Sequence, residues 1–146
     1  MDNNFRWGII GTGGIARAFT EDLKRIKNHR VSAVLSRSIK TANSFASKIL
    51  DCNSYNDIDL FLKDSTIDAV YIATPNIFHY KQSIRSLNAG KPVLCEKPFS
   101  MNSKEARFMV ETSEDNKVAL LEAMWMRYLP HISTIRNLIE EGSIGQ

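Results

Sequence analysis

A run of glycines between an apolar segment and an amphipathic one constrains the fold more than any other feature of this sequence. Residues 5–10 are mostly apolar, as in a buried strand, and residues 11–14 contain three glycines. From residue 15 to about residue 26, apolar side chains recur at near-helical spacing. The sequence therefore predicts a strand at 5–10, a tight turn at 11–14 and a helix at 15–26.

The same alternation of strand and helix continues along the chain. We predict further strands at residues 31–35, 68–73, 92–95 and 118–121, with a brief extended segment at 54–55. We predict further helices at residues 41–50, 57–63, 78–88 and 130–141, and one more that begins at a capping box of Asn102 and Glu105. Gly90 and Gly142 are placed to end two of these helices.

Apolar strands separated by helices indicate βαβ units, and therefore a parallel sheet with helices on both faces. The predicted fold class is α/β, with a doubly wound parallel sheet. We find no internal repeat, low-complexity tract or linker, so we expect residues 1–146 to form one domain.

Composition and charge exclude several other classes of protein. Hydrophobic residues make up 43% of the chain and charged residues 24%, which is typical of a globular protein. No apolar run approaches the roughly 20 residues that span a bilayer, and the polar start at residues 1–4 is unlike a secretory signal. The net charge is +3 with no dense Lys/Arg patch, so we do not expect nucleic acid as the main partner.

Cysteine and histidine usage gives no sign of a metal site. Cys52 and Cys95 show neither metal-ligand spacing nor a disulfide framework, and the three histidines are scattered. A reducing compartment, the cytoplasm, is the natural interpretation.

The glycine turn matches the pattern G-x-G-x-x-A over residues 11–16. In a dinucleotide-binding turn, Gly11 would allow the tight bend, Gly13 would let a pyrophosphate approach the backbone, and Ala16 would keep the helix close to the sheet. The helix N-terminus would favour the negative charge of the phosphates. Glycines also serve plain turns, but the position between a predicted strand and helix favours the dinucleotide. The candidate phosphate-binding residues are Gly11, Thr12, Gly13, Gly14 and Ile15.

The end of the second strand indicates which dinucleotide is bound. An Asp or Glu about 20 residues past the glycines would bind the ribose hydroxyls of NAD. This chain has Ser36, Arg37 and Ser38 there, with no carboxylate. Hydroxyls and a guanidinium suit a 2′-phosphate, so we expect NADP rather than NAD. The alternative is a solvated loop that is basic by chance.

Three further motifs, together with the glycine turn, resemble one known family. They cover Ala73 to Asn76 with His79, the segment 89–98, and the segment 122–130. In order and spacing they resemble the Gfo/Idh/MocA oxidoreductases, a family of Rossmann-fold proteins. The last segment is most similar to the branch with dimeric dihydrodiol dehydrogenase and NADP-dependent xylose dehydrogenase.

The resemblance implies hydride transfer between NAD(P) and a hydroxyl-bearing carbon of a sugar, polyol or diol. It gives Lys97 the catalytic role of hydrogen-bonding the reacting oxygen and moving its proton. Ligands bind at the carboxyl ends of strands in α/β sheets, and Lys97 follows a predicted strand there. We expect Lys97 to be partly buried and Pro98 to fix the backbone after it. Without the resemblance, a surface lysine before a turn would be the plainer interpretation.

The resemblance also assigns other residues to the cofactor. The turn at 73–76 would run along the ribose and pyrophosphate, and His79 would hold that turn, although a helix-cap histidine is an equal alternative. Trp125 and Arg127 would border the nicotinamide, although a tryptophan near a chain reversal is more often simple packing. The cofactor candidates from these motifs are Ala73, Thr74, Pro75, Asn76, His79, Glu96, Lys97, Trp125 and Arg127.

Members of the family carry a second α/β domain that supplies most of the substrate pocket and the usual homo-oligomer face. We expect residues 141–146 to stand at the start of such a domain, and the chain alone to bind NADP(H) with little turnover. A dinucleotide-sensing regulator is the alternative function, but a proton-handling lysine favours the enzyme. A scaffold that binds nothing is disfavoured by the glycine turn and by Arg37. The substrate itself stays open among polyol, aldose and diol.

Overall fold

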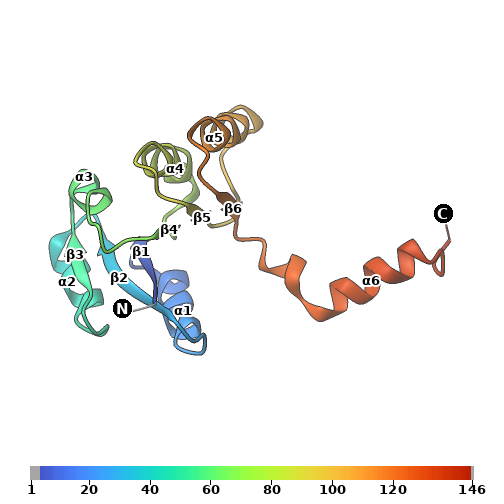
Figure 1. Cartoon of the computed structure of the whole chain (residues 1–146), viewed down its shortest axis with the longest axis horizontal. Helices are drawn as coiled ribbons and strands as arrows, with labels where there is room; N and C mark the ends of the chain where they lie inside the picture. The colour runs from blue at the N-terminus through green and yellow to red at the C-terminus, as the bar shows by residue number, and fades with distance from the viewer. Residues whose placement is uncertain (1–3, 146) are drawn as a thin grey trace.

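Six parallel strands form one sheet in the order β3-β2-β1-β4-β5-β6. The structure, a computed structural model, describes residues 4–145 (Figure 1). The strands are β1 (Phe5–Ile10), β2 (His29–Leu35), β3 (Asn53–Tyr55), β4 (Ala69–Ile72), β5 (Val93–Cys95) and β6 (Leu120–Glu122). This order, with the first strand in the centre, confirms the predicted doubly wound parallel sheet.

Helices connect the strands. They are α1 (Gly14–Leu23), α2 (Ile39–Ala46), α3 (Ile58–Leu62), α4 (His79–Asn88), α5 (Ser103–Asn116) and α6 (Pro130–Glu140), with short 3-10 helices η1 (Asn76–Phe78) and η2 (Trp125–Tyr128). In Figure 1, α4 and α5 lie on one side of the sheet and α1 on the other.

Two helices end earlier than we predicted. α1 ends at Leu23 rather than at residue 26, because the next amides bond three residues back, as in the bond from Ile26 N–H to Leu23 O at 3.0 Å. α2 begins at Ile39 and ends at Ala46 rather than at residue 50, for the same reason. Such tightening of a last turn satisfies carbonyls that have no partner within the helix.

The predicted capping box begins α5. The Asn102 side chain accepts a hydrogen bond from the Glu105 amide at 3.0 Å, and the Glu105 carboxylate accepts one from the Met101 amide at 3.1 Å. The carboxylate thus reaches the amide one residue before the cap. At the end of α4, Gly90 has φ +71°, a left-handed conformation that suits glycine.

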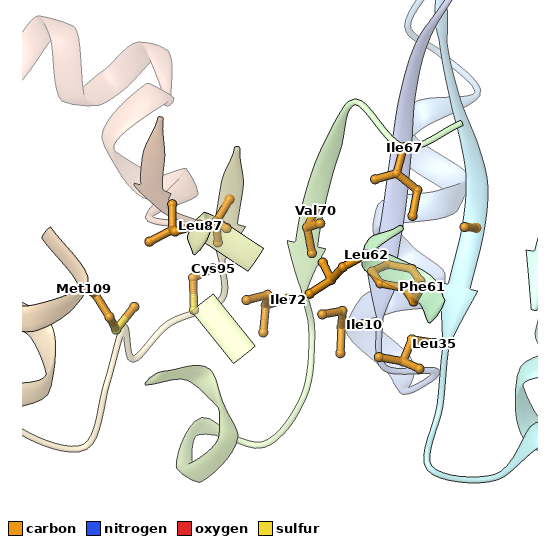
Figure 2. Close-up of a cluster of buried hydrophobic side chains, with 12 residues drawn as sticks. Ile10, Leu35, Phe61, Leu62, Ile67, Val70, Ile72, Leu87, Cys95 and Met109 are labelled. Atoms are coloured by element: carbon orange, nitrogen blue, oxygen red, sulfur yellow. The ribbon is translucent and has the colours of Figure 1, made fainter. Parts of the chain in front are cut away.

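Two apolar clusters lie on opposite faces of the sheet. The first, drawn in Figure 2, joins strand residues such as Ile72 and Cys95 to Phe61 of α3, Leu87 of α4 and Met109 of α5. The second joins β1, β2 and β4 to α1 and α2. Burial of these side chains supplies most of the free energy that favours folding.

One part of the sheet departs from the prediction that helices cover both faces. No β6 residue belongs to the cluster under α1 and α2, and from β5 only Leu94 packs against it. α6 does not cover this gap, because none of its residues is buried and it runs away from the sheet (Figure 1). The β5–β6 end of the sheet is therefore covered by helices chiefly on one face.

The Asp64 carboxylate ties the edge strand β3 to the turn after α3. It accepts hydrogen bonds from Asn53 at 3.0 Å, from the Tyr55 hydroxyl at 2.8 Å, and from both the amide and the hydroxyl of Thr66 at 2.7 Å. Burial alone would raise the pKa of Asp64, but these hydrogen bonds outweigh it and lower the pKa to about 2.

Candidate functional site

All six strands end at one level of the sheet. Ile10 pairs with Leu35 and with Ile72, Ile72 pairs with Cys95, and Cys95 pairs with Glu122. The residues after each strand are therefore gathered along a single edge, where α/β sheets bind ligands. A cleft of about 560 Å³ lies along the β3-β2-β1-β4 part of this edge.

The glycine turn forms one wall of this cleft. Gly11 has φ +110°, and a Cβ added to it would stand 2.7 Å from the Ala73 carbonyl oxygen, so only glycine fits. A Cβ on Gly13 would meet nothing within 4 Å, which leaves its backbone open to a ligand. Ala16 is fully buried, which brings α1 close to the sheet as expected. The first turn of α1 contains no acidic residue, so its amides can receive an anion.

Eight of the predicted cofactor residues line the cleft. They are Gly11, Thr12, Gly13, Ser36, Arg37, Ala73, Thr74 and Pro75. The other nine are not among its lining residues: Gly14, Ile15, Ser38, Asn76, His79, Glu96, Lys97, Trp125 and Arg127. The structure thus brings three separate sequence motifs into one cavity.

Several lining residues were missed from the sequence. They are Ile10, Leu35, Asn56, Ile58, Phe78, Lys81, Gln82 and Arg85. Spacing could have indicated some of them, since Lys81, Gln82 and Arg85 share one face of the helix after Pro75. Asn56 and Ile58 needed the tertiary structure, because the predicted elements at 54–55 and 57–63 do not indicate that the segment between them borders the cleft.

The residues that line the cleft include bases but no acids. Arg37, Lys81 and Arg85 are cationic, and no Asp or Glu is among the lining residues. Arg85 forms an ion pair with Asp59 of α3, while Arg37 is exposed at the end of β2. Ser36 is placed by its amide, which donates to the Tyr55 carbonyl at 3.0 Å. This end of the cleft therefore suits a ligand with negative charge.

A buried carboxylate fixes the loop after β5. Glu96 is 9% exposed, and its Oε1 accepts a hydrogen bond from the Tyr71 hydroxyl at 2.6 Å. Its Oε2 accepts one from the Lys97 amide at 3.2 Å. Burial, and then the bond to Glu96, raises the pKa of Tyr71, so its hydroxyl stays protonated and donates. Both carboxylate oxygens of Glu96 are therefore engaged inside the protein.

His79 joins two loops of the same edge. Its side chain is buried, with Nε2 2.8 Å from the Thr74 carbonyl oxygen and Nδ1 2.9 Å from the Pro98 carbonyl oxygen. His79 is the first residue of α4, whose N-cap is Phe78, and both ring nitrogens contact carbonyl oxygens outside the helix, so the ring does not cap α4. It instead connects the turn after β4 with the loop that carries Lys97.

Lys97 departs from one expectation. We expected partial burial, but its side chain is exposed, because the chain leaves the sheet directly after Glu96. Trp125 and Arg127 are exposed as well, in η2. The roles assigned to these three residues stay predictions.

Within residues 4–145, no group of three or more His, Cys, Asp or Glu side chains is placed to hold a metal ion. No helix in that part of the chain is both long and apolar enough to cross a membrane.

A parallel sheet in this strand order, with a glycine turn between its first strand and first helix, defines a dinucleotide-binding domain of the Rossmann class. A family model described as "Oxidoreductase family, NAD-binding Rossmann fold" matches residues 5–124. The chain therefore belongs to the Gfo/Idh/MocA oxidoreductase family, which confirms the resemblance found in its motifs.

Individual relatives agree with this assignment. A D-xylose 1-dehydrogenase (NADP(+)) from Hypocrea jecorina is 38% identical over 152 residues, which cover 96% of this chain and 39% of that protein. A trans-1,2-dihydrobenzene-1,2-diol dehydrogenase from Mus musculus is 37% identical over 142 residues, which cover 96% and 43%. The chain thus spans about two fifths of the length of the curated relatives it matches.

A solved structure has the same fold over nearly the whole of this chain. A 3-ketoreductase from Actinomadura kijaniata, in complex with TDP-benzene and NADP, has a TM-score of 0.88 at 28% identity, covering 99% of this chain and 46% of that one.

Proposed function

We propose that this chain is the NADP(H)-binding domain of an oxidoreductase that acts on a hydroxyl or carbonyl carbon of a sugar, polyol or dihydrodiol. One observation carries the cofactor assignment: the glycine turn and Arg37 line the same cleft, and no carboxylate lines it. Relatives whose names specify NADP(+) or a diol substrate support it.

The residues of the cleft fit NADP. The amides at the start of α1 would bind the pyrophosphate, with Gly13 open to its approach. The guanidinium of Arg37, with the Ser36 hydroxyl, would bind the 2′-phosphate. The turn from Thr74 to Asn76 would run beside the ribose.

Lys97 would serve the chemistry at the other end of the edge. When bound, NADP accepts or supplies the hydride. In the oxidising direction, Lys97 Nζ would receive the proton of the substrate hydroxyl as the carbon loses hydride, and in the reducing direction it would return that proton. The bond from the Lys97 amide to Glu96 would hold the backbone from which this side chain extends. Because Lys97 is exposed to water, we expect the 146-residue chain to bind NADP(H) but to turn over sugars or diols very slowly.

We also place the protein in the cytoplasm. Both cysteines are free, and burial raises the pKa of Cys95 to about 12, so it is an unreactive thiol in the core. Free cysteines agree with a reducing compartment.

Isothermal titration calorimetry with NADP⁺ and with NAD⁺ tests the cofactor assignment. We expect NADP⁺ to bind more tightly, and Arg37→Ala to weaken NADP⁺ by at least about tenfold, since a charge-assisted hydrogen bond contributes about 1.5–3 kcal/mol. Binding of NAD⁺ should barely change. Arg107→Ala, which removes an exposed arginine on α5, is the matched control. Equal loss of both dinucleotides, or a preference for NAD⁺, would contradict the role of Arg37.

A further inference from the structure

The cleft contains apolar side chains for which the phosphate groups of a dinucleotide give no reason. Leu35, Ile58, Pro75 and Phe78 line it, together with the polar side chain of Gln82 on α4. In NADP the 2′-phosphate and the pyrophosphate are attached to one ribose, and that ribose also carries the adenine. A flat aromatic base suits a cleft with apolar walls and few polar groups. If NADP binds as proposed above, these side chains therefore surround its adenine.

The Gln82 carboxamide is held in one orientation. The Thr74 hydroxyl donates a hydrogen bond to Gln82 Oε1, with 2.5 Å between the two oxygens. That distance is typical of an O–H···O hydrogen bond and too short for N–H···O, so Oε1 rather than Nε2 faces Thr74. The Thr74 carbonyl oxygen in turn lies 2.8 Å from Nε2 of the buried His79, which fixes the backbone that carries this hydroxyl.

The nitrogen of the same carboxamide is not used by the protein. Within residues 4–145, Gln82 Nε2 makes no hydrogen bond, and the side chain is half-buried in the wall of the cleft. A primary amide whose oxygen is occupied offers N–H donors to a ligand. Gln82 therefore suits a ligand atom that accepts a hydrogen bond, and it would be left unpaired by an atom that donates one.

Among purine bases this distinction falls on N1. Adenine N1 accepts a hydrogen bond, whereas N1 of hypoxanthine or guanine carries a hydrogen and donates. N1 lies on the edge of the base farthest from the ribose. The phosphates of that ribose would be bound after β1 and β2, while Gln82 lies on α4, which follows β4 on the other side of β1. The N1 edge of the base would therefore face Gln82.

We propose that Gln82, oriented by Thr74, selects adenine over other purine bases by donating a hydrogen bond from Nε2 to adenine N1. The inference rests on the proposed function, since it needs the glycine turn and Arg37 to bind the phosphates of the same adenosine. Gln82 is then a specificity-determining residue for the cofactor. Thr74 is a positioning residue that acts through Gln82.

Isothermal titration calorimetry with NADP⁺ and with its hypoxanthine analogue, in which C6 carries an oxygen and N1 a hydrogen, tests the proposal. We expect the wild-type chain to bind NADP⁺ at least about tenfold more tightly, because the analogue sets two donors against each other. Gln82→Glu keeps an oxygen for Thr74 but replaces the donor with an acceptor. This variant should bind the analogue at least as tightly as NADP⁺. Its added negative charge weakens both dinucleotides alike, so the ratio of their affinities reports on the base.

Two further variants separate the base from the rest of the cleft. Thr74→Val removes the hydroxyl that holds Oε1, so the carboxamide can rotate and the affinity ratio should fall below about threefold. Lys81→Ala is the matched control, since Lys81 is the neighbouring lining residue and its charge acts on both dinucleotides. Its affinity ratio should equal that of the wild-type chain. Circular dichroism checks that each variant is folded.

The possible failures are distinguishable. NADP⁺ binding with no discrimination between the two bases would refute this inference and leave the proposed function standing. A ratio that Gln82→Glu leaves unchanged, or that Lys81→Ala alters as strongly, would do the same. An unchanged ratio in Thr74→Val would overturn the positioning role of Thr74. No binding of either dinucleotide would refute the proposed function, and this inference with it.

Discussion

Replacing Gly11 with alanine should destabilise the fold before any ligand is considered. Gly11 follows β1 directly and begins the turn, with φ +110°. An added Cβ would stand 2.7 Å from the Ala73 carbonyl oxygen, closer than real Cβ atoms approach other atoms. Neither backbone can move freely, because the Gly11 amide donates to the Leu35 carbonyl at 2.8 Å and the Ala73 amide donates to the Ile10 carbonyl at 2.9 Å.

The cost follows from these contacts. A non-glycine residue in this backbone conformation costs about 1–3 kcal/mol. Relieving the overlap with Ala73 means lengthening one of the two strand hydrogen bonds, which costs about 1 kcal/mol more. Alanine also restricts the unfolded chain, which returns about 0.4–1 kcal/mol. We expect a net loss of about 2–3 kcal/mol, or a fall in Tm of roughly 6–12 °C for a chain of this size.

Thermal unfolding followed by circular dichroism measures this loss. Gly14→Ala is the control, because its Cβ would meet nothing within 4 Å and Gly14 is the first residue of α1. Alanine there should leave Tm unchanged or raise it slightly. A fall of less than about 2 °C for Gly11→Ala would refute the steric reasoning, since the backbone would then have absorbed the methyl group.

Three further predictions concern the site, the core and acid stability. Gly13→Ala should leave Tm unchanged, because the added Cβ points into open space. It should weaken the binding of NADP⁺ by about tenfold or more in a titration, since the methyl group would occupy the pyrophosphate's approach. Unchanged affinity would place the phosphates elsewhere. Phe61→Ala empties a fully buried position. It should lower the free energy of unfolding, measured with denaturant, by about 3–5 kcal/mol. A loss below about 1 kcal/mol would mean that Phe61 is not part of a packed core. The pKa of Asp64 is lowered from 3.8 to about 2, so the stability that its ionised form contributes is complete above pH 4 and is lost as the pH falls toward 2. Asp64→Asn should remove about 2 kcal/mol of this acid dependence in unfolding curves measured across that range, and an unchanged slope would contradict it.

Local sequence patterns predicted most of the fold. The apolar run at 5–10, the glycine turn and the repeated alternation predicted the parallel sheet, because strand and helix periodicities differ and can be recognised without tertiary contacts. Helix ends were less predictable. The early end of α1 depends on which carbonyl each amide of the last turn reaches, and apolar spacing carries no information about that choice.

The site was predictable where one short segment supplies the chemistry. Gly11, Gly13 and Arg37 all line the cleft, and each was recognised within a short local motif. Lys81 and Arg85 were missed, because a basic residue on a helix is usually solvated, and only the tertiary structure shows that this helix face borders the cleft. The contact from Tyr71 to Glu96 was missed for a similar reason, since it joins side chains 25 residues apart across the sheet.

The sequence by itself determined the fold class, the family and the turn that would receive phosphate, because each depends on the order and spacing of residues along a short stretch of chain. Only the tertiary structure decided that the six strands end in register, that His79 joins two loops, and that α6 does not pack on β5 and β6. Packing between distant segments depends on which surfaces meet. An amphipathic pattern specifies that a helix has an apolar face, but not which surface covers that face.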